Sequence, residues 1–545
     1  MAARFGRWAR WPALALLCAL SPLASVAPLA LPAQAARTVL RLPMQQDVPT
    51  LDPGLAEDSA SIEVIEQLFL GLTDFDDETA EVVPELATEW SASADGLTYT
   101  FRLREARWSD GRPVTAADLV WAARRNIAPA TASPYAYMMY GLRGAEAINT
   151  GREPDPARLG VEAVDDRTVR FRLVRPAAYF PGVAGMWMLR PLPRWAIEAH
   201  GAAWSEPAHI VVNGPYRLTE WRRGDRLVLR RNEAYYGARA VAIPEVRYLM
   251  VPESTTGLAM YENGELDLLG GGYLSLPAPD IPRIKADPVL GRQLRITPAM
   301  CTYYLGFNTA RPPLDDTRVR KALSAAIDRR LLIERVVRGD QRPATTFVPT
   351  PVFGAVPPEA GVGIGHDPER ARRWLAEAGY PGGKGFPPVV LMYNTSEGHA
   401  RIAQAVQQMW RRDLGVEVRL ENQEWKVYLQ TTTRADGPHI FRLAWCADYP
   451  DANNWLMEVF HPTRSANRVH WKNAEFARVT ERAQAVQDPA ERRRLYRRAE
   501  EILTQEEAVI APVYFYTQVT LTPPYLQARL APLGGNHLRD WRFTD

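Results

Sequence analysis

Strand-like and helix-like patterns alternate along most of this chain, and that alternation constrains the fold more than any other feature of the sequence. Segments in which polar and apolar residues alternate are typical of half-buried strands, and amphipathic segments behind capping residues are typical of helices. Strands are predicted at residues 98–104, 168–174, 226–230, 389–393, 416–420 and 440–445, and helices at 116–126, 317–337, 367–377, 399–414 and 489–507. We therefore predict a mixed α/β fold.

The first 35 residues are predicted to be an export signal. Three arginines precede an apolar run over residues 11–31, and Ala33-Gln34-Ala35 then has the small-x-small pattern that signal peptidase cleaves. Prolines inside the run argue against a stable membrane helix. Cys18 would be the acylated residue of a lipoprotein, but Leu17 before it is larger than the usual small residue. We expect cleavage near Ala35 and a periplasmic location, with a lipid or helical anchor as the alternative.

Charge and composition exclude several classes of partner. The formal net charge is +2, and the leader carries three arginines and no acid, so the remainder of the chain has a charge of −1. This balance gives no electrostatic reason to bind nucleic acid or an anionic membrane. A hydrophobic content of 46% and a charged content of 23% are typical of a folded protein, and 545 residues suggest about three or four domains.

Only two cysteines follow the leader, and they lie far apart. Cys301 precedes Thr302-Tyr303-Tyr304, and Cys446 lies 145 positions later, in Trp445-Cys446-Ala447-Asp448-Tyr449. In an exported protein, a single pair at this separation would join two distant segments through one bridge. Asp448 follows Cys446 by two residues and lies between aromatic residues, where a carboxylate can hold an ammonium group.

These residues closely resemble the periplasmic oligopeptide-binding proteins of ABC importers, the family 5 extracellular solute-binding proteins. Six further landmarks follow in the order expected of that family: WSDGRPVT at 108–115, ASPY at 132–135, NGPY at 213–216, RVRKAL at 318–323, YNTS at 393–396 and NQEW at 422–425. Each motif is weak alone, but their ordered run covers nearly the whole mature chain. The resemblance implies three lobes with mixed sheets and a ligand enclosed between lobes that close by a hinge motion.

The resemblance also implies the division into lobes and the disulfide. Lobe one would combine residues 36–69, 198–300 and 517–545, lobe two would span 70–197, and lobe three 301–516. Cys301 and Cys446 match the family's bonded pair, and export would bring them to an oxidising compartment.

The two charged ends of a peptide would have separate partners. The resemblance assigns Asp448 to the free α-amino group, because an enclosed ammonium needs an opposite charge; the alternative is an acid in a structural turn. Arg442 and His399 stand where the family places basic groups for the carboxylate, with Arg442 preferred because a guanidinium is always charged. A surface arginine and a solvated histidine are the alternatives. A third basic position of the family is Val337 here, with Arg338 beside it, so the preferred peptide length stays open.

Between its ends, a peptide would pair with main chain in the manner of a strand. Glu57 and Ser59 match one such segment of the family, and residues 444–446, which end at Cys446, match the other. Tyr135, Trp425 and Trp445 match residues that line side-chain pockets, although each is also compatible with an ordinary core aromatic. A polar pair of the family is replaced here by glycines at 271–272.

Signs of catalysis are absent from the sequence. The chain has no Gly-x-Ser-x-Gly elbow, no His-Glu-x-x-His motif and no nucleotide-binding lysine loop. The glycines of residues 361–365 follow two prolines and predict a plain loop. His461 and His470 lack a cysteine or histidine at metal-ligand spacing. We therefore expect no cofactor and no metal site.

The sequence thus predicts a non-catalytic, monomeric periplasmic receptor that captures oligopeptides and presents them to an ABC permease. The ATPase would be a separate chain. One alternative keeps this fold and changes the ligand to a murein tripeptide, a dipeptide or a non-peptide solute. Another class of protein, a periplasmic peptidase or chaperone, would instead cleave or hold unfolded chains.

Overall fold

The computed structural model describes residues 37–544, apart from residues 46 and 466. The predicted export signal at residues 1–35 lies outside this part of the chain, and its cleavage stays a prediction. Within the described residues, helices and strands alternate in chain order, as the sequence predicts for a mixed α/β fold.

Residues 39–250 build two four-stranded sheets. The order of the first is β1-β10-β9-β8, with β1 and β10 parallel and the other pairs antiparallel. The order of the second is β4-β5-β7-β6, and all of its pairs are antiparallel. The strands are β1 (Val39–Met44), β4 (Ala87–Ala92), β5 (Thr98–Leu103), β6 (Val161–Asp165), β7 (Thr168–Arg172), β8 (Tyr216–Arg222), β9 (Arg226–Arg231) and β10 (Glu245–Met250). The three strands predicted in this region, now β5, β7 and β9, are confirmed to within two residues.

A third, mixed sheet has the order β11-β17-β12-β16-β14-β15, with β13 paired to β17. β12 is antiparallel to both β16 and β17, whereas β14 is parallel to both β15 and β16. Its strands are β11 (Leu269–Gly270), β12 (Leu294–Phe307), β13 (Arg342–Pro343), β14 (Val389–Asn394), β15 (Val418–Gln423), β16 (Ile440–Cys446) and β17 (Ile510–Leu521). The strands predicted at 389–393, 416–420 and 440–445 are confirmed, with ends shifted by up to three residues.

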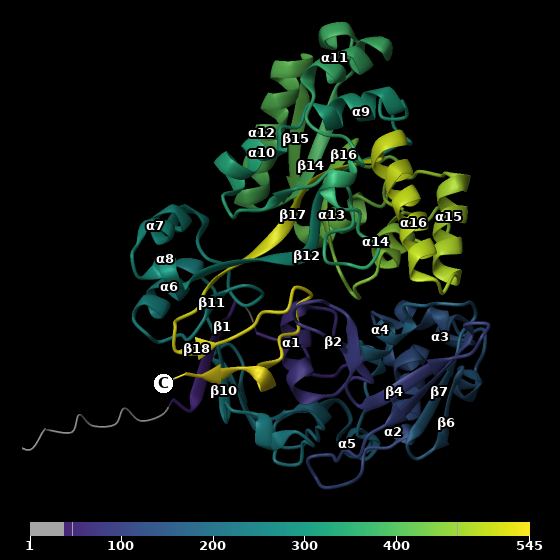
Figure 1. Cartoon of the computed structure of the whole chain (residues 1–545), viewed down its shortest axis with the longest axis vertical. Coiled ribbons are helices and arrows are strands. Elements are labelled where there is room, and N and C mark those ends of the chain that lie inside the picture. The colour runs from purple at the N-terminus through teal and green to yellow at the C-terminus, as the bar shows by residue number, and fades with distance from the viewer. Residues whose placement is uncertain (1–36, 46, 466, 545) are drawn as a thin grey trace, which may run out of the picture. The chain divides into compact units, whose positions relative to one another are not determined.

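Alternate side chains of β12 fill the two faces of this sheet. Tyr303, Leu305 and Phe307 belong to one buried cluster, and Tyr304 belongs to another. The first cluster contains residues of α9 (Thr317–Ala325), α11 (Pro368–Glu377) and α12 (Glu397–Leu414), and the second contains residues of α14 (Ala452–Phe460), α15 (Ala474–Ala485) and α16 (Pro489–Glu500). This division follows from the period of two along a strand. Figure 1 shows the two groups of helices on different sides of the sheet.

Several helices begin behind a residue whose side chain caps the first turn. The helices are α1 (Ser59–Leu68), α2 (Ala116–Ile127), α3 (Ala145–Asn149), α4 (Phe180–Gly185), α5 (Arg194–His200), α6 (Ser254–Glu262), α7 (Ile281–Ala286), α8 (Leu290–Gln293), α9 (Thr317–Ala325), α10 (Arg329–Leu332), α11 (Pro368–Glu377), α12 (Glu397–Leu414), α13 (Trp425–Thr431), α14 (Ala452–Phe460), α15 (Ala474–Ala485) and α16 (Pro489–Glu500). At the start of α2 the backbone N–H of Thr115 donates to Asp118 at 2.9 Å, which completes a capping box.

The single helix predicted over residues 317–337 is wrong. α9 ends at Ala325, and α10 begins after Asp328, whose carboxylate accepts a hydrogen bond from the backbone N–H of Leu331 at 2.9 Å. An aspartate that caps a new helix in this way interrupts the preceding one. The helix predicted over 489–507 is α16 followed by a π-helical segment, Glu501–Glu506.

The end of the chain returns to the first sheet. β18 (Leu526–Gln527) pairs with β19 (Arg542–Phe543), as β2 (Thr73–Phe75) does with β3 (Val82–Pro84). Leu538 and Trp541 are buried in the same cluster as Tyr216, whose hydroxyl donates to the carbonyl of Leu538 at 3.3 Å. Residues near the C-terminus are thus brought beside segments that lie more than 300 positions earlier.

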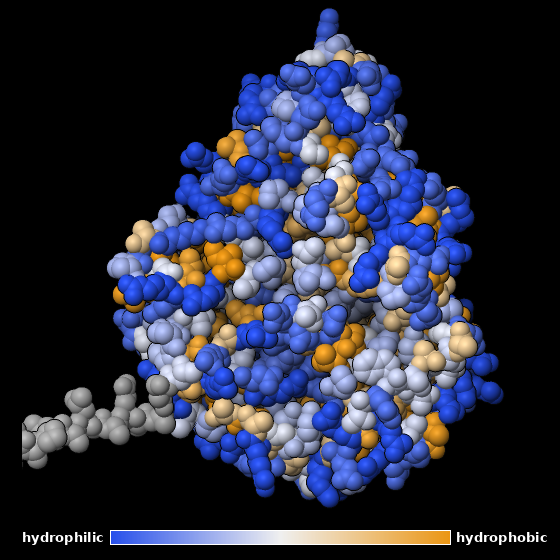
Figure 2. Space-filling view, viewed as in Figure 1, coloured by the Kyte–Doolittle hydropathy of each residue, from blue (hydrophilic) through white to orange (hydrophobic). Residues whose placement is uncertain are grey.

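The surface is mostly hydrophilic on the face shown in Figure 2, with scattered hydrophobic patches, several of them near its hollowed centre. Scattered apolar residues are normal on a protein surface. Among residues 37–544, no helix combines the length and the hydrophobicity that crossing a bilayer requires.

Candidate functional site

β16 leads to the candidate site and is held in place by β12. Cys301 and Cys446 lie opposite each other in the antiparallel register of these strands and form a disulfide across 145 positions of sequence. The predicted bond is therefore confirmed. β14 pairs only with Ile440 and Phe441 of β16. No described strand pairs with residues 442–446 on the side away from β12. The carbonyl of Arg442 accepts a hydrogen bond from the Tyr428 hydroxyl at 2.5 Å, so the free strand edge comprises residues 443–446.

Six of the nine predicted site residues line one cavity of about 330 Å³, which we call the first cavity. Ser59 is the first residue of α1, Glu57 lies in the segment just before that helix, and Tyr135 comes from the loop after α2. The end of β16 and the turn after it supply the remaining three: Trp445, Cys446 and Asp448. The structure thus brings together three segments that are far apart in the sequence.

The C-terminal tail closes another side of the first cavity. Residues 531–535 and His537 line it together with Asp74. His537 contacts Asp74 at 3.0 Å and Asp77 at 2.7 Å, and Arg539 contacts Asp74 at 2.6 Å. Burial alone would lower the pKa of His537, but the neighbouring Asp74 carboxylate holds it well above its ordinary value. These buried ion pairs hold the C-terminal tail against β2.

Asp448 presents a half-buried carboxylate to the first cavity. Its Oδ2 accepts a hydrogen bond from Nδ2 of Asn454 at 3.0 Å, and no described residue donates to its Oδ1. Burial raises the pKa of Asp448 to about 6, although the bond from Asn454 opposes the shift. The group is therefore charged at neutral pH and keeps free lone pairs toward the cavity.

Asn454 fixes the orientation of this carboxylate. Its amide oxygen accepts hydrogen bonds from Nε1 of Trp445 at 3.0 Å and from the backbone N–H of Asp448 at 3.1 Å. With its oxygen facing two donors, Asn454 must point its NH₂ group toward acceptors. That group also donates to Oε2 of Glu458 at 2.8 Å, one turn further along α14. Sequence reasoning missed Asn454 and Glu458; their (i, i+4) spacing shortly after Asp448 was the available signal.

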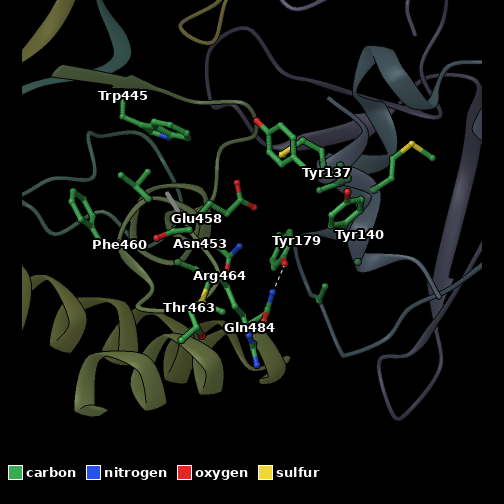
Figure 3. Close-up of a pocket in the computed structure, with 18 of the residues that line it drawn as sticks. Tyr137, Tyr140, Tyr179, Trp445, Asn453, Glu458, Phe460, Thr463, Arg464 and Gln484 are labelled. Atoms are coloured by element: carbon green, nitrogen blue, oxygen red, sulfur yellow. Dashed lines mark hydrogen bonds between the residues drawn. The ribbon is translucent and has the colours of Figure 1, made fainter. Parts of the chain in front are cut away.

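A second cavity of about 880 Å³ adjoins the first. Trp445 lines both, and the rings of Tyr135 in the first and Tyr137 in the second lie 5.6 Å apart. Figure 3 shows Glu458 between Trp445 and Tyr137, and Tyr179 accepting a hydrogen bond from Gln484.

Glu458 is an acid in an unfavourable environment. Its Oε1 accepts a hydrogen bond from the Tyr449 hydroxyl at 2.5 Å. Burial raises the pKa of Glu458 to about 8; the nearby Asp448 carboxylate adds to the rise, while the bonds from Tyr449 and Asn454 oppose it. Near neutral pH the side chain therefore holds a proton in this ligand-free structure.

This shift predicts how stability depends on pH. Glu458 titrates near 8 when folded and near 4.5 when exposed, so its contribution is fully present below pH 4.5 and is lost as the pH rises to about 8. Relative to Glu458→Gln, the wild type should lose roughly 2 kcal/mol over that window, less than the full linkage value because the side chain is only partly buried. Urea unfolding of both proteins at pH 5, 7 and 9 would measure this, and a difference that does not change with pH would contradict it.

Arg442 and His399 lie together but apart from the two cavities. Arg442 is 7% exposed, donates to Asn394 at 3.0 Å and to the Tyr516 hydroxyl at 2.7 Å, and stacks over the ring of Tyr303 at 4.6 Å. The ring of His399 lies 5.8 Å from the same Tyr303 ring. Burial lowers the pKa of His399 to about 3, and the charge of Arg442 contributes, so this histidine is neutral. Neither residue lines the first or the second cavity.

The remaining predicted positions are less informative. The backbone of Trp425 begins α13, but its side chain lies outside the described residues. Val337 ends a π-helical segment, and Arg338 after it has a left-handed backbone with φ of 60°. Gly271 follows β11 with φ of 63°, a conformation that suits glycine. Among the described residues, no three histidine, cysteine, aspartate or glutamate side chains are grouped as metal ligands.

Comparison with known proteins gives consistent matches. Residues 81–467 match the family described as bacterial extracellular solute-binding proteins, family 5 Middle. The chain is 34% identical over 506 residues to the oligopeptide-binding protein OppA of Bacillus subtilis, with 91% of each chain covered. It is 34% identical over 498 residues to YgiS of Escherichia coli, named a probable deoxycholate-binding periplasmic protein, with 90% of each chain covered. The solved structure of the murein tripeptide-binding protein MppA of Escherichia coli superposes with a TM-score of 0.76 at 32% identity, covering 93% of this chain and 98% of that one.

Proposed function

Because this chain belongs to the bacterial extracellular solute-binding proteins of family 5, we propose that it captures oligopeptides and presents them to the permease of an ABC importer. Relatives named for oligopeptide binding cover most of its length. The protein acts in the periplasm as a monomeric receptor without catalytic activity, after cleavage of the export signal near Ala35.

The observation that carries this proposal is a free strand edge that ends at an unpaired carboxylate. Residues 443–446 of β16 have one side that pairs with no described strand, and Asp448 follows them with its Oδ1 free. An extended peptide can add to such an edge through main-chain hydrogen bonds, which recognise no side chains. Its α-ammonium then meets Asp448, while Glu57 and Ser59 border the cavity from α1.

The same strand offers a partner for the other end of the peptide. Arg442 lies four positions before Cys446, which corresponds to roughly 13 Å of strand and to an extended tetrapeptide. We propose that a peptide of three or four residues spans this length and approaches Arg442 or His399 with its carboxylate. Tyr135, Trp425 and Trp445 would border its side chains.

The proposed lobes supply the mechanism of capture. Lobe one comprises residues 36–69, 198–300 and 517–545, lobe two 70–197, and lobe three 301–516. Glu57 and Ser59 then belong to lobe one, Tyr135 to lobe two, and Asp448 to lobe three. A ligand bound by all three favours the state in which they are close together, so binding stabilises a closed form that the permease can recognise.

Binding of matched solutes tests the function directly. At a peptide concentration about 100 times the dissociation constant, linkage should stabilise the protein by roughly 2.7 kcal/mol, which raises its melting temperature. Calorimetry and thermal unfolding should be carried out with tri- and tetrapeptides, a dipeptide, a murein tripeptide and deoxycholate. Mass spectrometry of the peptide after incubation should recover it intact.

Each other outcome assigns a different function. Stabilisation by the murein tripeptide, the dipeptide or deoxycholate alone would mean that the protein is a receptor for that solute and not for oligopeptides. Fragments of the peptide would indicate a peptidase. Binding of unfolded protein in place of short peptides would indicate a chaperone. Deoxycholate is included among the solutes because one relative of this chain is named as a probable deoxycholate-binding protein.

A further inference from the structure

Two carboxylates lie close together at the junction of the cavities. Asp448 faces the first cavity and Glu458 the second. Both accept a hydrogen bond from Nδ2 of Asn454, at 3.0 and 2.8 Å, so their bonded oxygens cannot lie further apart than these two distances combined. Two ligand groups only a few bonds apart can therefore contact both.

This pair has no cationic partner in the part of the chain that the structure describes. Among the described residues, neither carboxylate forms an ion pair with an arginine, lysine or histidine. Three of the described arginines line the second cavity. Arg464 pairs with Glu481 at 3.1 Å, Arg468 donates to the carbonyl of Leu429 at 2.6 Å, and the charge of Arg175 lowers the pKa of Tyr179 and His461. Two half-buried acids without a counter-ion are unfavourable, and a bound cation offsets that cost.

Glu458 also has the capacity to bind a cation. Its two oxygens accept one hydrogen bond each, from Tyr449 and Asn454, while a carboxylate has about four acceptor positions. Figure 3 shows its carboxylate facing the space between Trp445 and Tyr137. Aromatic rings around a cation add favourable interactions with their faces.

We propose that Glu458 binds a second positive charge of the ligand, and that the site thereby selects peptides whose first residue is cationic, such as lysine, ornithine or 2,4-diaminobutyrate. This rests on the proposed function, in which Asp448 binds the α-ammonium. The side chain of the first residue passes Trp445 into the second cavity and places its ammonium at Glu458.

Binding of the second cation releases a proton from Glu458 to solvent below pH 8. The titratable or charged groups that face Glu458 are Asp448 and Asp451, which raise its pKa, and the hydroxyls of Tyr135, Tyr137, Tyr179 and Tyr449. Burial raises the pKa of each of these tyrosines above its ordinary value, so they stay neutral between pH 6.5 and 8.5. Preference for a cationic first residue should therefore increase with pH over this range.

Calorimetry with matched tripeptides tests the inference. Lys-Ala-Ala and norleucine-Ala-Ala differ by one ammonium group, and Ala-Ala-Lys carries the same charge at the other end. At pH 8.5 the wild type should bind Lys-Ala-Ala roughly 10- to 100-fold tighter than norleucine-Ala-Ala, as expected of one charge-assisted hydrogen bond. The ratio should be smaller at pH 6.5, and buffers of different ionisation enthalpy should reveal the released proton. In Glu458→Gln the ratio of the two affinities should fall to near one.

The outcomes separate this inference from the proposed function. Equal binding of the lysine and norleucine peptides at both pH values, with loss of both on N-acetylation, would overturn the role of Glu458 and leave the receptor function intact. Binding of neither peptide would overturn both. If Glu458→Gln does not fold, the ratio in the wild type still decides, because a preference that does not increase with pH contradicts the inference.

Discussion

Asp448→Asn is expected to weaken the binding of tri- and tetrapeptides by roughly two to three and a half orders of magnitude. The substitution keeps the shape of the side chain and its bond from Asn454 but removes the charge. An enclosed α-ammonium then lacks its counter-ion, which costs about 3–5 kcal/mol, and each 1.4 kcal/mol is tenfold in affinity. Calorimetry at pH 7.5 with free peptides would measure the loss.

Ligand chemistry supplies a control for this prediction. N-acetylated peptides should bind the wild type weakly, and the substitution and the acetyl group together should cost less than the sum of their separate effects, because both remove one interaction. Asp436→Asn changes an exposed acid paired with Arg434 at 2.7 Å and should leave affinity unchanged. Unchanged affinity in a folded Asp448→Asn protein would remove this residue from the site and favour a ligand without a free amine.

The pH dependence of binding should follow the same carboxylate. Since the pKa of Asp448 is about 6 in the absence of ligand, its negative charge is lost as the pH falls through that value. Affinity for a neutral tripeptide should therefore decrease below about pH 6 in the wild type, and Asp448→Asn should lack this decrease.

Removal of the disulfide should cost the protein about 2–4 kcal/mol of unfolding free energy. A bridge across 145 positions restricts the unfolded chain, and chain entropy sets an upper value of about 5 kcal/mol for such a loop. The native pairing should survive in Cys301→Ala/Cys446→Ala, because β12 and β16 remain paired over the seven positions from Cys301–Cys446 to Phe307–Ile440. Urea unfolding of the wild type with and without reductant, and of the double variant, would measure the effect.

Peptide affinity should change little in the double variant. The strand edge and the Asn454 contacts that orient Asp448 do not depend on the sulfur atoms. Two free thiols in protein prepared from the periplasm without reductant would show that the bond does not form there. Loss of binding in a folded double variant would mean that the bond also shapes the site.

Local signals in the sequence were sufficient for much of the fold. Alternating side chains marked β5, β7 and β9, the place between predicted helices marked β14, β15 and β16, and Thr115 with Asp118 marked the start of α2. Such patterns depend on residues one to four positions apart, which strand and helix periodicity brings to one face. Resemblance to a family whose motifs recur here in order supplied two further predictions. One is the disulfide between Cys301 and Cys446, and the other is the role of Asp448 in binding the ligand's α-amino group.

Tertiary structure decided what the site contains. Glu57 and Asp448 are separated by almost 400 positions, and only the packing of distant segments brings them to one cavity. The side chain of Arg442 is buried against Tyr303 and bonded to Tyr516, although its place on a strand allowed an exposed position. The sequence does not distinguish Asn454 and Glu458 from any other polar pair on a helix. The structure shows that Asn454 donates hydrogen bonds to both Asp448 and Glu458.

The sequence by itself therefore determined the class of fold, most helix and strand positions, and the carboxylate at the end of β16. The tertiary structure decided that this carboxylate keeps a free oxygen, that β16 keeps a free edge, and that a second acid lies beside it. The physical reason is the distance along the chain over which each effect acts. Propensity and periodicity act over one or two turns of chain, whereas the electrostatics of a site depend on burial and on neighbours from anywhere in the sequence.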